Sequence, residues 1–162
     1  MGDRRDWADG LHQRVEQLID EYRRALHDSL NSLSEEEARR RLVASKTTLL
    51  GLVKHASFVE GVWFDQAVTG RSYREIGIAA TVDGSFKLRE TDTIASVQAE
   101  YRDRWATSAG NLDGRSLDEV VEGRGARQVW ALKLQVLCEL AQHAGHVDIL
   151  REQIISGRSP TP

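Results

Sequence analysis

The positions of the prolines restrict the fold of this chain more than any other feature of its sequence. Both prolines, Pro160 and Pro162, lie at the very end of the 162 residues. Proline removes a backbone hydrogen-bond donor and disrupts a helix from within. Because the rest of the sequence lacks this interruption, long helices are free to form, and the prediction is an all-α fold.

Four segments repeat their apolar residues at helical spacing. The expected helices cover about residues 11–30, 45–70, 92–109 and 127–155, the third beginning near Thr91 or Asp92. Between the first two, Ser34–Glu37 has the pattern of a capping box and predicts a short helical turn. These segments predict a four-helix bundle, and the length of the chain fits a single domain over residues 1–162.

The segment 71–90 departs from the helical pattern and joins the second and third predicted helices. Asp83-Gly84 lies between two short apolar runs, which is typical of a β-hairpin. An irregular crossover loop explains the same residues equally well, and both interpretations remain open. A long connection at this point suits a bundle whose second and third helices are not simple antiparallel neighbours.

Charge and hydropathy exclude several classes of function. The net charge is −3, and only Ala38 separates the basic run Arg39–Arg41 from Glu35–Glu37, so an ion-paired helix face is expected rather than a nucleic-acid interface. No apolar run is long enough to span a bilayer, and the first residues lack the apolar stretch of a signal peptide. We therefore expect no membrane partner and a cytoplasmic location. The single cysteine, Cys138, forms no internal disulfide and suits a reducing compartment.

Histidines on apolar helix faces are the strongest candidates for a metal-binding site. His55 shares a stripe with neighbouring apolar residues of the second helix, while Glu139, His143 and His146 share one face of the last helix. Buried imidazoles need partners, and one divalent cation would satisfy several at once. Mixed imidazole and carboxylate ligands suit Zn²⁺ first, and Ni²⁺ or Fe²⁺ nearly as well. The alternative is that these histidines are hydrogen-bonded residues of the core, and their spacing alone does not decide between the two interpretations.

The remaining candidates are expected to be structural. His12 and His27 have charged neighbours on the first helix, so solvent exposure is predicted for both. Cys138 is rotated by about 100° from Glu139 on a helix and is expected to be a small buried apolar residue.

Two stretches of sequence resemble the DinB-like superfamily, and specifically its branch associated with mycothiol. Residues 45–55 together with 62–64 resemble the second helix of that family, and residues 139–152 resemble its last helix. The resemblance implies an up-down-down-up four-helix bundle that holds a metal ion through one ligand from the second helix and two from the last. Members of the family are expected to form homodimers.

The resemblance assigns the first ligand to His55 but leaves two sets open. The common superfamily pattern has two histidines four residues apart, whereas position 142 here is Gln and position 139 is Glu. The preferred set is His55, His143 and His146, because histidine is the better neutral ligand, with Glu139 orienting an imidazole from outside. The alternative set is His55, Glu139 and His143.

The resemblance also implies a function. Members of the superfamily act as transferases that use a low-molecular-weight thiol such as mycothiol, and we expect a metal-dependent S-transferase that joins this thiol to an electrophilic small molecule. A metal ion with an open position would bind the thiol as a thiolate at neutral pH. The alternatives are a non-catalytic bundle that binds a metal or small ligand, and a thiol-dependent isomerase.

Overall fold

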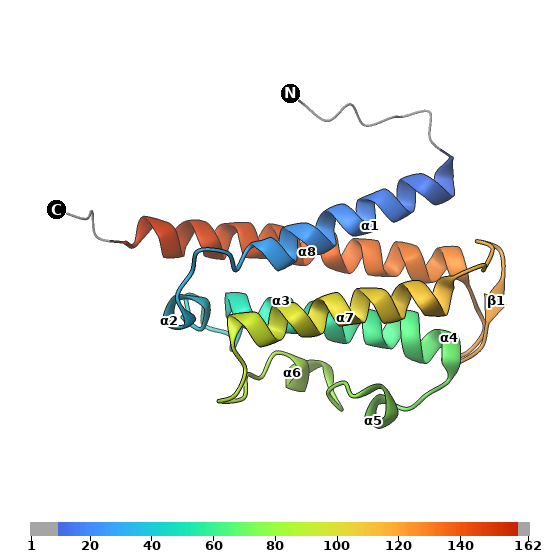
Figure 1. Ribbon diagram of the computed structural model, residues 1–162, viewed down its shortest axis with the longest axis horizontal. Helices are drawn as coiled ribbons and strands as arrows, with labels where there is room; N and C mark the ends of the chain where they lie inside the picture. Colours follow the sequence, from blue (N-terminus) through green and yellow to red (C-terminus); the bar gives the residue numbers. More distant parts are fainter. Residues whose placement is uncertain (1–9, 159–162) are drawn as a thin grey trace.

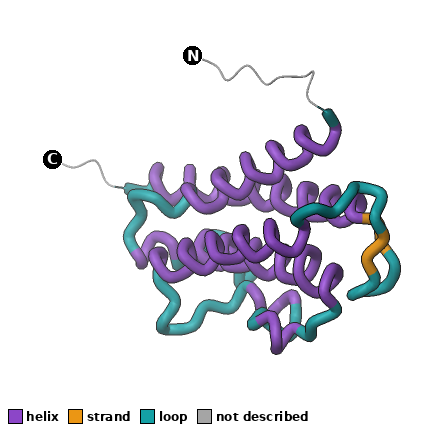
Figure 2. The backbone as a smooth tube through the Cα atoms, turned by 45° about the vertical axis from the view of Figure 1, so that its right-hand side comes forward, coloured by secondary structure: helices purple, strands orange, loops and turns teal. Residues whose placement is uncertain are grey.

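The computed structural model describes residues 10–158, and most of them are helical. The elements in chain order are α1 (Leu11–Asp28), α2 (Glu35–Ala38), α3 (Leu49–Glu60), η1 (Gly61–Gln66), α4 (Ala67–Thr69), α5 (Tyr73–Ile76), α6 (Val82–Ser85), α7 (Ile94–Leu112), β1 (Val120–Val121), β2 (Arg127–Gln128) and α8 (Val129–Ser156). The two short strands pair antiparallel between α7 and α8, at one end of the molecule (Figure 2). The prediction of an all-α fold therefore holds, apart from this small ribbon.

Four long helical segments lie side by side in the described part of the chain (Figure 1). They are α1, the run formed by α3, η1 and α4, then α7, and finally α8. In Figure 1, α1 and α8 run in one direction, while α3 and α7 run in the opposite one. Helix α3 contacts both α7 and α8, and α1 packs mainly against α8. The interface between α3 and α8 thus joins the second and last predicted helices.

Side-chain caps mark the beginnings of α2, α3 and α7. Ser34 forms the predicted capping box with Glu37 at the start of α2. Helix α3 begins after Thr48, whose side chain accepts from the Gly51 amide, rather than after Ser45. Helix α7 likewise begins after Thr93 and not after Thr91 or Asp92. The predicted caps of α3 and α7 were wrong by one to three residues, because several residues able to cap a helix stand close together in each segment.

The second long segment contains a π-helical stretch that the sequence did not predict. Residues Gly61–Gln66 form this stretch, η1, and the Asn111 side-chain amide of α7 donates to the Phe64 carbonyl at 3.0 Å. This bond satisfies a backbone acceptor within the altered helical ladder. The segment ends at Gly70 in the left-handed conformation, as predicted.

The crossover between α4 and α7 is neither a hairpin nor wholly irregular. It contains α5 and α6, two single-turn helices that are capped by Ser72 and Thr81. The crossover lies very close to α3: a Cβ atom built on Gly51 would stand 2.9 Å from the Phe86 carbonyl oxygen. Lys54, also on α3, donates to the Lys87 carbonyl at 2.9 Å. Glycine at position 51 therefore allows α6 to lie directly on α3.

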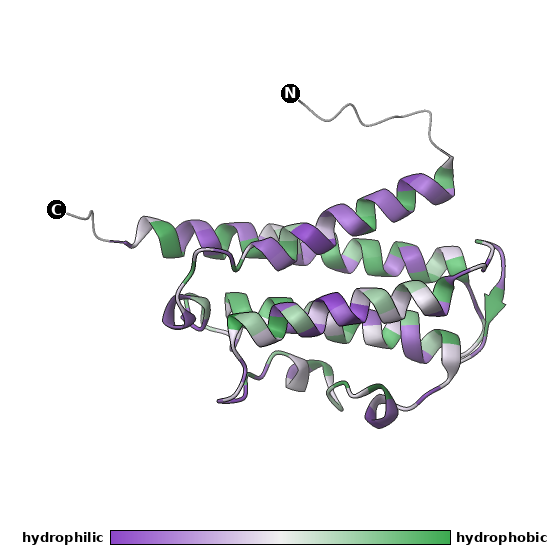
Figure 3. Cartoon of the chain, in the orientation of Figure 1, coloured by the Kyte–Doolittle hydropathy of each residue, from purple (hydrophilic) through white to green (hydrophobic). Residues whose placement is uncertain are grey.

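The core runs along the interfaces of the long helices, with apolar faces turned inward (Figure 3). It also encloses an ion pair, in which Arg23 donates to both carboxylate oxygens of the fully buried Glu60. On α8 the predicted inward stripe was wrong at its beginning, since Trp130 and Leu134 are 42% and 43% exposed. No helix in residues 10–158 has both the length and the apolar character that crossing a bilayer requires.

Candidate metal centre

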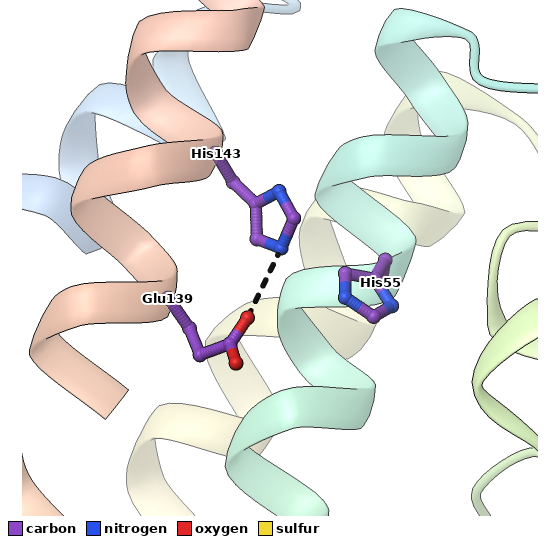
Figure 4. Close-up of side chains that lie close together, drawn as sticks. All are labelled: His55, Glu139 and His143. Carbon is purple, nitrogen blue, oxygen red and sulfur yellow. Dashed lines mark ion pairs between the residues drawn. The ribbon is translucent and has the colours of Figure 1, made fainter. Parts of the chain in front are cut away.

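Three side chains converge between α3 and α8. His55 comes from α3, and Glu139 and His143 come from consecutive turns of α8 (Figure 4). One ligand atom from each lies within 4.8 Å of the others. His143 Nε2 is 3.4 Å from a Glu139 carboxylate oxygen, and the two imidazole rings meet edge to face with centroids 4.8 Å apart. A spacing of this size is what two imidazoles and a carboxylate need to reach one cation without backbone movement.

The hydroxyl of Ser85 determines which nitrogen of His55 faces this cluster. Ser85 Oγ donates to the Val82 carbonyl at 2.5 Å, and it lies 2.7 Å from His55 Nδ1. Because the serine proton is already engaged with the carbonyl, the hydroxyl oxygen accepts from Nδ1–H. Nε2 of His55 is then unprotonated and keeps its lone pair for a cation.

Aromatic packing holds the His55 ring in this orientation. The Phe86 ring, which follows Ser85 in the chain, stacks on the imidazole at a centroid distance of 3.9 Å and an interplanar angle of 14°. Phe58, one turn later on α3, lies on the same imidazole at 5.8 Å. The close approach of the crossover at Gly51 brings both Ser85 and Phe86 to the histidine. The ring is therefore fixed by packing as well as by its hydrogen bond.

Helix α8 presents its two residues on one face because they are four positions apart. His143 is buried, whereas the Glu139 side chain remains 31% exposed. Gln135, one further turn toward the N-terminus, donates its amide to Glu139 Oε1 at 3.0 Å. One carboxylate oxygen is thus held by the glutamine while the other lies nearest His143, on the side of the cluster that reaches solvent.

Burial keeps both histidines neutral. It lowers the pKa of His55 to about 4, and the adjacent His143 adds to the shift. Burial also lowers the pKa of His143, although the Glu139 carboxylate acts in the opposite direction. Neutral imidazoles have free lone pairs at physiological pH, which is the protonation state that a metal ligand requires.

The hydrogen bonding of His143 provides a test of whether a metal ion fits here. Both of its ring nitrogens are buried and make no hydrogen bond among the described residues, so the 3.4 Å contact of Nε2 with Glu139 is the one polar contact of this ring recorded there. An imidazole without partners in a buried position is costly. A divalent cation bound by Nε2 would give that nitrogen a strong partner and would also neutralise the Glu139 charge, so the donor set fits such an ion.

The other predicted residues lie outside this cluster. His146 is exposed on α8, with its ring centroid 5.9 Å from that of His143, and it is absent from the group of converging ligand atoms. His12 is exposed as predicted, but the His27 side chain is only 12% exposed, because it packs against Trp105. Cys138 is exposed, so the prediction of a buried apolar residue was wrong.

The residues that support the cluster were missed from the sequence. Ser85 and Phe86 lie in the crossover, where no periodic pattern indicated that they would reach α3. Gln135 resembles any other polar residue of an amphipathic helix. Gly51 was the one available signal, because a glycine inside an apolar helix often marks a close backbone approach.

The comparison with known families agrees with the resemblance seen in the sequence. The sequence model of the family described as mycothiol-S-transferase matches residues 14–156, which include the whole cluster. Among curated proteins, none matches the sequence significantly.

Proposed function

The chain belongs to the mycothiol S-transferase family, and from this premise we propose that it joins mycothiol, or a similar thiol, through its sulfur to an electrophilic small molecule with the help of a divalent metal ion. The observation that carries the metal dependence is the convergence of three ligand atoms within 4.8 Å between α3 and α8. Neither the family match nor the three converging ligand atoms would support this function alone, because a fold hosts many functions and a site with three metal ligands serves many reactions.

We propose His55, Glu139 and His143 as the ligands, in place of the set that includes His146. His55 would bind through Nε2, since Ser85 occupies Nδ1. His143 would bind through the nitrogen that faces Glu139. Three protein ligands would leave a divalent ion free to bind one further group, and zinc would suit this mixture of imidazole and carboxylate.

The chemistry follows from that open position. A divalent ion held by these three residues would lower the pKa of a bound thiol, so that a thiolate nucleophile is available at neutral pH. The protein's own residues then keep the ligating imidazoles neutral and hold the ligating groups in position. His55 and His143 remain neutral because they are buried, and Gln135 and Ser85 hold the ligating groups in orientation. The sulfur forms a bond to the electrophilic carbon, the leaving group departs with the electron pair of the broken bond, and the thiol proton passes to water.

We also propose that the four long helices, with their order of directions, form the up-down-down-up bundle expected from the resemblance, as one domain. A homodimer and a cytoplasmic location belong to the same proposal. Sedimentation equilibrium measures the first directly, and fractionation of cells that produce the protein measures the second.

The experiment is a transfer assay with mycothiol and monobromobimane, in which the rate above the uncatalysed reaction is measured for zinc-loaded protein. We expect thiol consumption that chelation abolishes and that re-addition of zinc restores. His55→Ala should be inactive at the same zinc concentration. Stoichiometric zinc binding without any thiol consumption would contradict the transferase and leave a metal-binding bundle. Turnover that survives complete removal of metal would contradict the metal dependence.

A further inference from the structure

A cavity of about 350 Å³ lies on α8 next to the metal cluster, and its lining differs from that of two other cavities of similar or larger size. It is lined by the C-terminal half of α8 and by the segment that precedes α3; its residues are Val43, Ser45, Thr47, His146, Ile149, Leu150 and Gln153. None of these is an aspartate, glutamate, lysine or arginine. By contrast, a cavity of about 520 Å³ is lined by Arg23, Lys133 and Glu16, and one of about 330 Å³ by Lys54, Lys87 and Arg89.

The lining includes apolar side chains that residues 10–158 leave about half uncovered. Ile149 is 57% exposed and Val43 is 42% exposed, although both are large aliphatic residues. Exposed apolar groups that gather around a concave surface are typical of a binding site for an apolar ligand. A charged occupant would lose its hydration here without gaining an ion pair.

His146 links this cavity to the cluster. It lines the cavity, and its ring centroid lies 5.9 Å from that of His143, one helical turn away. It is also the one imidazole in the lining, so it offers a hydrogen bond at the boundary between the cavity and the metal ligands. A ligand in the cavity would therefore have its polar end directed by His146 toward the reacting sulfur.

From these observations we propose that the cavity is the subsite for the electrophile, that the electrophile is an uncharged and largely apolar small molecule, and that His146 orients its polar group. This inference rests on the proposed transferase function. Mycothiol itself is built on hydroxyl-rich rings and gains little from an aliphatic lining, so the cavity fits the acceptor rather than the thiol. The acceptor would be held with its electrophilic carbon toward the cluster, where the carbon–sulfur bond forms and the leaving group departs as an anion.

The test compares two isoleucine substitutions on the same helix. Ile149→Glu places a charge in the cavity, while Ile155→Glu changes a residue that is 41% exposed and does not line it. The first measurement is independent of activity: fluorescence titration of zinc-loaded protein with tetramethylbimane, which is uncharged and unreactive. We expect Ile149→Glu to weaken this binding about tenfold or more, equivalent to about 1.4 kcal/mol. Ile155→Glu should bind the probe within about twofold of wild type.

The second measurement is the preference of the enzyme for monobromobimane over the much smaller iodoacetamide, as a ratio of kcat/KM values with mycothiol. We expect Ile149→Glu to lower this ratio about tenfold, mainly through the KM for monobromobimane. His146→Ala should lower kcat at unchanged zinc content, and His146→Gln, which retains a donor, should recover part of it.

The outcomes distinguish a failure of the proposed transferase function from a failure of the proposed electrophile subsite. If wild-type protein shows no transfer with either electrophile, the proposed function is wrong, and any probe binding reports an apolar site of another kind. If transfer occurs but Ile149→Glu changes neither probe binding nor the preference, the electrophile subsite is wrong and the transferase stands. Loss of zinc in His146→Ala would also contradict the role of His146 in the electrophile subsite, because His146 would then act as a metal ligand.

Discussion

The hydroxyl of Ser85 lies 2.7 Å from Nδ1 of His55 while donating its own proton to the Val82 carbonyl. This arrangement allows only one tautomer of the imidazole to complete the hydrogen bond. The serine therefore determines that Nε2, and not Nδ1, is available between α3 and α8.

The first prediction concerns this serine. Ser85→Ala should weaken zinc binding by about 10- to 100-fold, the range found when a partner that orients a metal ligand is removed. Competition with a chelator of known affinity measures the change. Ser57→Ala is the matched control, because Ser57 is a buried serine of α3 whose hydroxyl has no hydrogen-bond partner among the described residues. Equal zinc affinity of the two variants would show that Ser85 does not orient His55.

The second prediction concerns the contact between α3 and the crossover. Gly51→Ala places a methyl group 2.9 Å from the Phe86 carbonyl, so the crossover must shift, at a cost of about 1–3 kcal/mol in the free energy of unfolding. Gly110→Ala on α7 meets nothing within 4 Å and should instead stabilise by about 0.5–1 kcal/mol. Urea denaturation of both variants measures the difference. A stabilising Gly51→Ala would mean that the crossover does not lie against α3.

The third prediction is a pH dependence of the metal-free protein. The pKa of His55 is about 4 in the folded state against 6.5 for the unperturbed group, so the unfolded chain binds the proton first. The free energy of unfolding should consequently fall as the pH drops from about 6.5 to about 4, and His55 contributes at most about 3 kcal/mol to this fall. Thermal denaturation in the presence of EDTA follows this change. His55→Gln should reduce the slope in that range, with His143 contributing the remainder, and an unchanged slope would contradict a buried neutral imidazole at position 55.

The fourth prediction concerns the buried ion pair. Glu60→Gln leaves the Arg23 charge in the core with the half-exposed Asp20 as its remaining ion-pair partner within residues 10–158, and should destabilise the protein by about 3–5 kcal/mol. Asp20→Asn removes the other, 49% exposed partner of the same arginine and should cost less than about 1 kcal/mol. Chemical denaturation distinguishes them, and similar losses from both would show that Arg23 does not depend on Glu60.

The long helices and their caps illustrate what the sequence could predict. The absence of internal proline and the spacing of apolar residues predicted the helices, and Gly70 predicted the end of the second segment correctly. The α8 stripe was wrong at its start because residues 129–137 contain apolar side chains on every face, so periodicity does not distinguish the exposed Trp130 and Leu134 from the buried Leu132 and Val136.

The candidate site was only partly predictable, for a physical reason. Residues on one helix face can be recognised from spacing, and this selected Glu139, His143 and His146 together. Spacing cannot determine which of three such residues meets His55, because that depends on how α8 is rotated against α3. Ser85 and Phe86 reach the site through the path of the crossover, which no periodic pattern encodes.

The ligand set is the central claim, and the zinc content of dialysed variants tests it most directly. Wild-type protein should retain about one ion per chain, as three ligands with an open position imply. His55→Ala, His143→Ala and Glu139→Gln should each lose the ion, while His146→Ala should retain it. Loss of zinc from His146→Ala with retention by Glu139→Gln would contradict the account and assign the site to His55, His143 and His146.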